Sequence, residues 1–366
     1  MVDLKLPALL DLACAIQQIP APTFHETARA AFVRDQMLAE GLMDVEIDDL
    51  GNVFARRPGL DPAAAPVLVT AHLDTVFPAE TPLTLARGAD RIAGPGIGDN
   101  SLGVAGLFGL VWSLREQTLP ADLWLAANVG EEGLGDLCGM RRVVDRLGAR
   151  ARAIIVLEGM ALGHIYHSGL GVRRYRISAH TEGGHSWLHF GRPSAIHILL
   201  RLGARITELP VPAAPRTSFN IGTIAGGTSI NTIARQASFD LDLRSESPAA
   251  LASLAAQVES LAGEFNAPDV TIELKVVGDR PVGAIPRSHP LVQLAAQALA
   301  EVGISDCAFE TGSTDANIPL SRGIPCVCLG LTRGANSHRP DEYIETTDLE
   351  RGLAAVTRVV RGAFSL

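Results

Sequence analysis

A chain of 366 residues is longer than one ordinary hydrophobic core supports, so its length predicts two domains. Apolar residues make up 47% and charged residues 19%, as in ordinary soluble globular proteins. The net charge of −9, from 31 basic and 40 acidic residues, excludes the basic footprint that nucleic acids and anionic membranes require, so neither is expected as a partner.

Cysteine usage and the N-terminus indicate the expected compartment. Five dispersed cysteines form no disulfide framework and are typical of a reducing cytoplasm. Residues 1–6 lack the basic start and long apolar core of a signal peptide. No uninterrupted apolar stretch reaches the roughly 18 to 20 residues of a membrane span. We therefore expect a cytoplasmic protein with no membrane partner.

In the first half of the chain, short apolar runs alternate with helical patterns. The predicted elements, in chain order, are strand 67–71, helix 101–116, strand 123–127, helix 139–147 and strand 153–157. Strands separated by crossover helices predict an α/β domain with a mostly parallel central sheet covered by helices.

From about Gly171, alternating apolar and polar residues predict half-exposed strands. The elements follow the order β-α-β-β-α-β, over residues 172–178, 193–208, 219–224, 237–244, 248–265 and 270–277. This is the order of a ferredoxin-like α+β module. A helix at 290–302, a strand at 325–329 and a helix from Asp348 then complete the first domain. The expected domains are residues 1–171 with 286–366, and an inserted domain of residues 172–285.

Acidic residues and histidines lie near the ends of the predicted strands. His72 and Asp74 follow strand 67–71, where the imidazole can bind a metal while the aspartate orients the ring. A structural histidine fits this short motif equally well. Asp99 follows the glycine-rich turn 94–98, where its carboxylate can either bridge two cations or cap the next helix.

Three glutamates repeat this arrangement. Glu131 and Glu132 come just after strand 123–127, and Glu158 ends strand 153–157. Because an unpartnered buried charge is costly, a cation is a suitable partner. Glu132 can then bind a metal while Glu131 takes a proton from the attacking water. His338 lies in a loop near the C-terminus and, on its own, would be read as an ordinary loop histidine.

Together these residues supply the donors that two divalent ions need. Open α/β sheets collect their active sites at the carboxyl ends of strands. Two histidines and three carboxylates, one of them bridging, suit zinc, and cobalt or manganese are also compatible.

The residues, in this order, resemble the co-catalytic zinc peptidase and deacylase family. That family includes acetylornithine deacetylase, succinyl-diaminopimelate desuccinylase, aminoacylase, peptidase T and a bacterial glutamate carboxypeptidase. The resemblance covers nearly the whole chain and implies a zinc-peptidase-like catalytic domain with two metal ions. Five ligands are implied: His72 and Glu158 on one ion, Glu132 and His338 on the other, and Asp99 bridging both. It also implies that Asp74 orients the histidine, that Glu131 is the catalytic base and that the Asp99–Asn100 peptide is cis.

The predicted inserted domain resembles the lid and dimerisation domain of the same family. Gly183-Gly184-His185-Ser186 is similar to the segment whose histidine reaches the partner subunit's active site and stabilises the oxyanion. Asn231 and Arg244 resemble residues that bind a substrate carboxylate, which a guanidinium suits; a turn residue and an exposed strand residue are the alternatives. The loop 312–317 resembles a catalytic-domain loop. Four other histidines have no matching role and are left as structural: His164, His167, His180 and His189.

The predicted activity is hydrolysis of an amide bond in a small peptide by a water that Glu131 deprotonates. The alternative is an N-acyl-amino-acid deacylase of the acetylornithine deacetylase type. A non-catalytic metal-binding protein would be expected to lack Glu131 or a ligand, and neither is missing. A nucleotide-binding protein would need a phosphate loop, which residues 94–98 do not match. The expected partners are a small peptide or N-acyl amino acid and a second copy of the chain.

Overall fold

The computed structural model describes residues 6–366, so most of the segment examined for a signal peptide lies outside the described residues. The chain divides into two compact units. Unit 1 consists of Met1–Gly169 and Gly283–Leu366, and unit 2 of Leu170–Val282. Unit 2 is therefore inserted into unit 1 in the sequence, with boundaries at 169/170 and 282/283 where 171/172 and 285/286 were expected.

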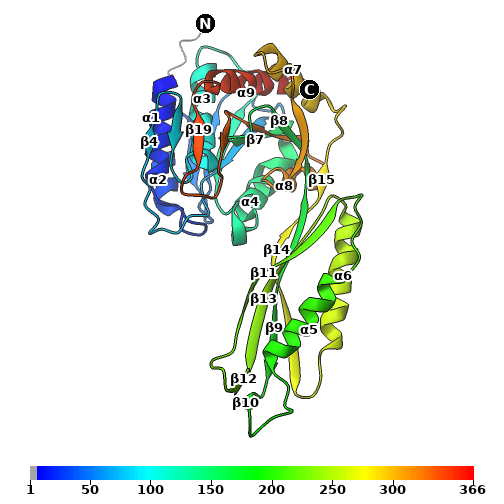
Figure 1. Ribbon diagram of the computed structural model, residues 1–366. Helices are drawn as coiled ribbons and strands as arrows, with labels where there is room; N and C mark the ends of the chain where they lie inside the picture. The colour runs from blue at the N-terminus through cyan, green and yellow to red at the C-terminus, as the bar shows by residue number, and fades with distance from the viewer. Residues whose placement is uncertain (1–5) are drawn as a thin grey trace. The chain divides into compact units, whose positions relative to one another are not determined.

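Unit 1 contains a nine-stranded mixed sheet with parallel central strands (Figure 1). Its order is β1-β2-β6-β3-β7-β17-β8-β15, and β16 pairs with β8. The strands are β1 (Met43–Ile47), β2 (Val53–Arg57), β3 (Val67–His72), β6 (Leu123–Asn128), β7 (Ala153–Glu158), β8 (His164–Gly169), β15 (Gly283–Ala284), β16 (Ala308–Gly312) and β17 (Cys326–Gly330). Strands β6, β3, β7 and β17 run parallel, which confirms the mostly parallel central sheet. They are buried from both sides, and this explains their nearly continuous apolar sequences.

Helices cover both faces of this sheet. They are α1 (Leu6–Gln17), α2 (Thr27–Ala39), α3 (Leu102–Leu114), α4 (Cys138–Leu147), α7 (Pro290–Glu301), α8 (Asn317–Ser321) and α9 (Leu349–Ala363). Figure 1 shows α3 and α9 on one side of β7 and α4 on the other. The segment Ile97–Leu114 is long and apolar enough to cross a membrane, but 83% of it is buried inside the structure, as in a core helix.

A second sheet in unit 1 joins segments that are far apart in the sequence. Its order is β18-β19-β5-β4. The strands are β4 (Ala86–Arg87), β5 (Arg91–Ala93), β18 (Gly334–Ala335) and β19 (Tyr343–Glu345). Each has only two or three residues, too few for a periodic pattern, and the sequence analysis did not predict them. The sheet fixes the segment on both sides of His338 against residues 86–93.

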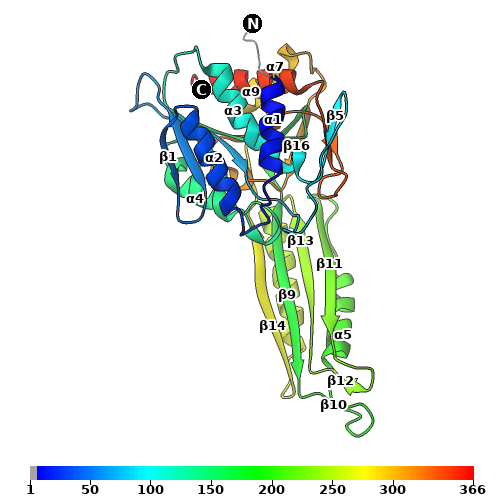
Figure 2. The same ribbon diagram turned by 90° about the vertical axis from the view of Figure 1, so that its left-hand side faces the viewer.

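Unit 2 has the predicted β-α-β-β-α-β order. Its elements are β9 (Gly171–Thr181), α5 (Ala195–Thr207), β11 (Thr217–Gly226), β13 (Gln236–Ser245), α6 (Pro248–Glu264) and β14 (Val270–Arg280). The antiparallel sheet has the order β11-β13-β9-β14, and both helices pack on one face (Figures 1 and 2). The ferredoxin-like prediction is thus confirmed. Two short strands, β10 (Gly184–His185) and β12 (Thr232–Ile233), pair beyond one end of this sheet.

Candidate functional site

Three parallel strands end at the same edge of the unit 1 sheet and carry candidate site residues. His72, the last residue of β3, lies beside Asn128, the last residue of β6. Glu158 is the last residue of the neighbouring strand β7. Glu131 and Glu132 follow β6 on a turn that begins at Gly130 (φ 64°). Parallel pairing therefore brings together side chains that are far apart in the sequence.

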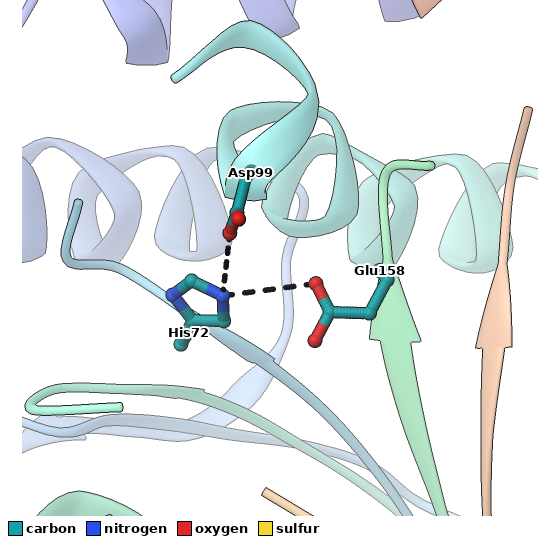
Figure 3. Close-up of side chains that lie close together, drawn as sticks. All are labelled: His72, Asp99 and Glu158. Carbon is teal, nitrogen blue, oxygen red and sulfur yellow. Dashed lines mark ion pairs between the residues drawn. The ribbon is translucent and has the colours of Figure 1, made fainter. Parts of the chain in front are cut away.

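His72, Asp99 and Glu158 form one cluster (Figure 3). His72 Nε2 lies 3.2 Å from Asp99 Oδ1 and 3.7 Å from Glu158 Oε2. The other ring nitrogen, Nδ1, lies 3.1 Å from the backbone carbonyl oxygen of Asp74 and 3.5 Å from its Oδ1. With Nδ1 engaged by Asp74, Nε2 is the nitrogen that faces the two carboxylates, as in a metal-binding histidine.

A second cluster shares Asp99 and adds Glu132 and His338. His338 Nε2 lies 3.3 Å from Asp99 Oδ2 and 3.3 Å from Glu132 Oε1. The two carboxylate oxygens of Asp99 therefore face different histidines. No side-chain hydrogen bond caps α3, so the capping alternative for Asp99 was wrong. The Asp99–Asn100 peptide is cis, as the resemblance implied.

The donor set of these clusters fits divalent cations. In each of three overlapping groups the donor atoms lie within 4.8 Å of one another: His72, Asp99 and Glu158; His72, Glu131 and Glu132; Asp99, Glu132 and His338. Burial raises the pKa of Glu132 and of Glu158 to about 7, because the charged carboxylate loses its hydration. For Asp99, burial is outweighed by His338 and His72, which lower the pKa. A cation would compensate the charge of these crowded carboxylates, and imidazole with carboxylate suits zinc, cobalt or manganese.

Asp74 has a wider role than the predicted orientation of a histidine. Its Oδ1 accepts a hydrogen bond from the backbone N–H of Glu131 (2.9 Å), and its Oδ2 accepts one from the N–H of Glu132 (2.9 Å). The hydroxyl of Thr23 also donates to Oδ2 (2.9 Å). Although Asp74 is fully buried, the contacts with His72 and the two amides outweigh burial and lower its pKa. Asp74 thus holds the Glu131–Glu132 turn beside the His72 ring.

Two buried acids next to these clusters were not predicted. Glu342 accepts hydrogen bonds on Oε1 from the N–H groups of Gly98 (2.7 Å) and Asp99 (2.9 Å). Because Glu342 engages these amides, they do not form the phosphate loop considered above. Asp315 lies in the loop 312–317 that the resemblance singled out, and its Oδ2 accepts from Asn128 Nδ2 (2.7 Å). Burial raises the pKa of Asp315 well above its ordinary value. No sequence signal indicated Glu342, because its partners are the backbone amides of Gly98 and Asp99.

His185 and Asn231 lie together at one end of unit 2. Strands β10 and β12 pair there, and the N–H of Ser186 donates to the carbonyl oxygen of Asn231 (3.0 Å). His185 Nδ1 accepts hydrogen bonds from the N–H groups of Trp187 (3.2 Å) and Leu188 (3.4 Å). The neutral ring therefore carries its proton on Nε2, which makes that exposed edge a hydrogen-bond donor.

Arg244 lies toward the opposite end of the unit 2 sheet. It pairs with Val172 at the start of β9, whereas Gln236, at the start of β13, lies near the His185 end. At about 3.3 Å per residue, the strand from Gln236 to Arg244 spans roughly 26 Å. The Arg244 side chain is 42% exposed, and its Nε donates to Asp242 Oδ2 (2.6 Å). One chain therefore does not bring Arg244 close to His185.

The four histidines without a predicted role make local contacts. These contacts are His164 Nδ1 with Glu310 Oε1 (3.2 Å), His167 Nδ1 with the carbonyl oxygen of Ile285 (2.7 Å), His180 Nε2 with Glu273 Oε2 (3.8 Å) and His189 Nδ1 with the N–H of His185 (2.9 Å). The last contact shows that His189 supports the turn on which His185 lies.

Comparison with known proteins identifies the family. The model of peptidase family M20/M25/M40 matches residues 68–362. The chain belongs to this family. The resemblance drawn from the motifs is thereby confirmed, and M20/M25/M40 is a family of peptidases and related hydrolases that generally depend on two metal ions.

Three relatives show how far the likeness extends. A probable carboxypeptidase of Aspergillus clavatus is 30% identical over 248 residues, covering 60% of this chain and 54% of that protein. The chain spans about half the length of the first fungal relatives it matches. The LysW-lysine hydrolase of Deinococcus radiodurans is 25% identical over 363 residues, covering 94% of this chain and 95% of that protein. The aminopeptidase PepT of Bacillus cereus has the same fold, with a TM-score of 0.78 and 21% identity over 98% of this chain and 99% of that chain.

Proposed function

We propose that this protein binds two divalent metal ions, zinc being the expected metal, and hydrolyses an amide bond in a small peptide. The observation that carries the proposal is the position of Asp99, with Oδ1 3.2 Å from His72 Nε2 and Oδ2 3.3 Å from His338 Nε2. His72 and Glu158 would hold one ion, and Glu132 and His338 the other. Asp99 would contribute one oxygen to each.

The residues around this centre have distinct tasks in the proposed reaction. Two ions bound there would polarise the scissile carbonyl and lower the pKa of a water between them. Glu131, which Asp74 holds through its backbone amide, takes the proton of the attacking water and passes it to the leaving nitrogen. The Nε2–H of His185 donates a hydrogen bond to the carbonyl oxygen as negative charge develops on it.

The residues of unit 2 support a homodimer in which unit 2 is the lid and dimerisation domain. Arg244 is suited to a substrate carboxylate, and His185 and Asn231 to the reacting end of the substrate. Within one chain these two groups are separated by roughly 26 Å of β-strand, at about 3.3 Å per residue. A small peptide does not span that distance. If all three residues touch one substrate, His185 and Asn231 come from a second copy.

Peptides are favoured as substrates, and N-acyl amino acids are the second candidate. The likeness to a probable carboxypeptidase supports a peptide. The likeness to LysW-lysine hydrolase covers nearly the whole of both chains, whereas the likeness to the carboxypeptidase covers 60% of this one. Because the hydrolase matches more of this chain than the carboxypeptidase does, N-acyl amino acids are retained as the second candidate.

Metal content and hydrolysis, measured on the same preparation, test the proposal. Wild type and Glu131→Gln are compared on dipeptides, tripeptides and N-acetyl-amino acids, with Glu310→Gln as a control acid of unit 1 outside the centre. We expect about two metal equivalents in all three proteins. We expect turnover to fall about 10²- to 10⁴-fold in Glu131→Gln alone. Wild type that binds no metal after reconstitution would contradict the metal centre, and bound metal without turnover would contradict these substrates.

A further inference from the structure

Glu342 connects two segments that carry candidate ligands. Its side chain is fully buried, four residues after His338. Its Oε1 accepts hydrogen bonds from the N–H groups of Gly98 (2.7 Å) and Asp99 (2.9 Å). Its backbone carbonyl accepts another from Gly94 (2.8 Å). Glu342 therefore joins the Asp99 segment to the His338 segment through both its side chain and its backbone.

The hydrogen bonds that Glu342 accepts lie at the backbone of Asp99, the residue shared by the two clusters. Asp99 lies between His72 and His338, with one oxygen toward each. Its backbone N–H is one of the two that Glu342 accepts, so the carboxyl of Glu342 fixes the point from which the Asp99 side chain extends. The carboxyl of Glu342 is not itself one of the groups gathered around either histidine.

We propose that Glu342 is a positioning residue that holds the shared carboxylate of Asp99 in place between the two ion positions. The inference rests on the proposed two-metal function. Glu342 acts by accepting the backbone amides of Gly98 and Asp99 on Oε1. A glutamine can keep both accepted bonds, whereas an aspartate is one methylene too short and an alanine has no acceptor.

The test compares Glu342→Gln, Glu342→Asp and Glu342→Ala with wild type. Protein stripped of metal is titrated with Co²⁺ and Zn²⁺ against a chromophoric chelator, and the Co²⁺ absorption spectrum is recorded. We expect Glu342→Ala and Glu342→Asp to lose about 10- to 100-fold in affinity for both ions, because the carboxylate of Asp99 is shared between them. We expect their Co²⁺ spectra to change and Glu342→Gln to restore both the affinity and the spectrum.

A control separates loss of positioning from general destabilisation. Asp122 is also buried and also accepts a backbone amide, from Gly59 (2.9 Å), and it contacts Arg56 away from the metal centre. Asp122→Asn should lower the unfolding midpoint and leave the affinity for both ions unchanged. If Glu342→Ala does not fold, Glu342→Asp against Glu342→Gln gives the same comparison.

Three outcomes would overturn the inference. The first is wild-type affinity for both ions in Glu342→Asp. That result would show that a negative charge at this position maintains the metal affinity without the hydrogen bonds to the two amides. The second is equal loss in Glu342→Gln and Glu342→Asp, which would show that accepting the amides is not the cause. The third is wild type that binds no metal, which would remove the proposed function as well, so the two failures are distinguishable.

Discussion

Asp74, Asn100 and Glu342 each form hydrogen bonds with the backbone beside a candidate ligand. Asp74 accepts the amides of Glu131 and Glu132. The side chain of Asn100 donates to the carbonyl oxygen of Leu157 (2.8 Å) and accepts from the N–H of Gly159 (2.9 Å), on either side of Glu158. Since these three residues are buried, their bonds are shielded from competition by water. The candidate ligands are thus held through their backbones by residues that need not bind metal.

Replacing Asp74 with asparagine should weaken the metal centre. Asparagine has one acceptor oxygen, so it can satisfy either Glu131 or Glu132, and its Nδ2 would face the other N–H donor. We expect metal affinity to fall about 10- to 100-fold, together with kcat. Competition with a chelator and steady-state kinetics on one preparation measure both. Unchanged affinity and kcat would show that the Glu131–Glu132 turn does not depend on Asp74.

Asp315 makes a pH-dependent prediction for the metal-free protein. Its folded-state pKa is raised well above the unfolded value of about 3.9. Between the two pKa values the folded protein holds a proton that the unfolded chain has lost, so this group makes stability fall as pH rises through that window. Asp315→Asn removes the effect.

We therefore expect Asp315→Asn to gain stability over wild type as pH rises from 4 to 7. Urea unfolding at several pH values measures the difference. A difference that does not change with pH would mean that Asp315 is ionised in the folded protein.

At the scale of elements, the strands that carry the site are also the core of unit 1. Ile155 is fully buried in β7 between Val69 of β3 and Val327 of β17. Ile155→Ala should destabilise unit 1 by about 2–5 kcal/mol through the cavity it leaves. The neighbouring strands keep the register of β7, so Glu158 stays in place and metal affinity should remain. Urea unfolding measures the stability of unit 1, and metal titration measures the affinity. A loss of metal affinity in Ile155→Ala would show that the affinity depends on the stability of the core.

Elements with a strong apolar pattern were predictable from the sequence, and elements without one were not. The buried strand Ala153–Glu158 and the alternating strand Gly171–Thr181 were both predicted. Strands β8 and β16 were missed because His164–Gly169 and Ala308–Gly312 mix polar and apolar residues and are mostly half-buried. The antiparallel position of β8 in the sheet was missed with them.

The candidate ligands were predictable for a different reason. Because His72 and Glu158 end parallel strands, the sheet itself brings them to one edge. His338 lies in a loop with φ 65°, and resemblance alone indicated its role. Glu342 could not be assigned, because its partners are backbone amides and the sequence carries no signal for an accepted amide.

At the scale of the whole molecule, the proposed dimer predicts complementation between two inactive variants. His185→Ala lacks the residue supplied to the partner, and Glu131→Ala lacks its own base. In an equal mixture half of the dimers are mixed, and each of these has one intact site, so about a quarter of wild-type activity should return. Steady-state assays after subunit exchange measure this. Activity no greater than the sum of the two variants alone would contradict sharing of His185 between chains.

The place of β17 in the sheet has a consequence for how the protein is made. A ribosome releases residues 1–169 first, then the continuous stretch of unit 2, and only afterwards Cys326–Gly330. Yet β17 lies between β7 and β8, which were synthesised about 160 residues earlier. Unit 2 can fold as soon as it emerges. In unit 1, the edges of β7 and β8 that pair with β17 stay unpaired until β17 has been made. Because His338 emerges later still, a growing chain has no complete set of the candidate ligands until the segment that follows β17 has been made.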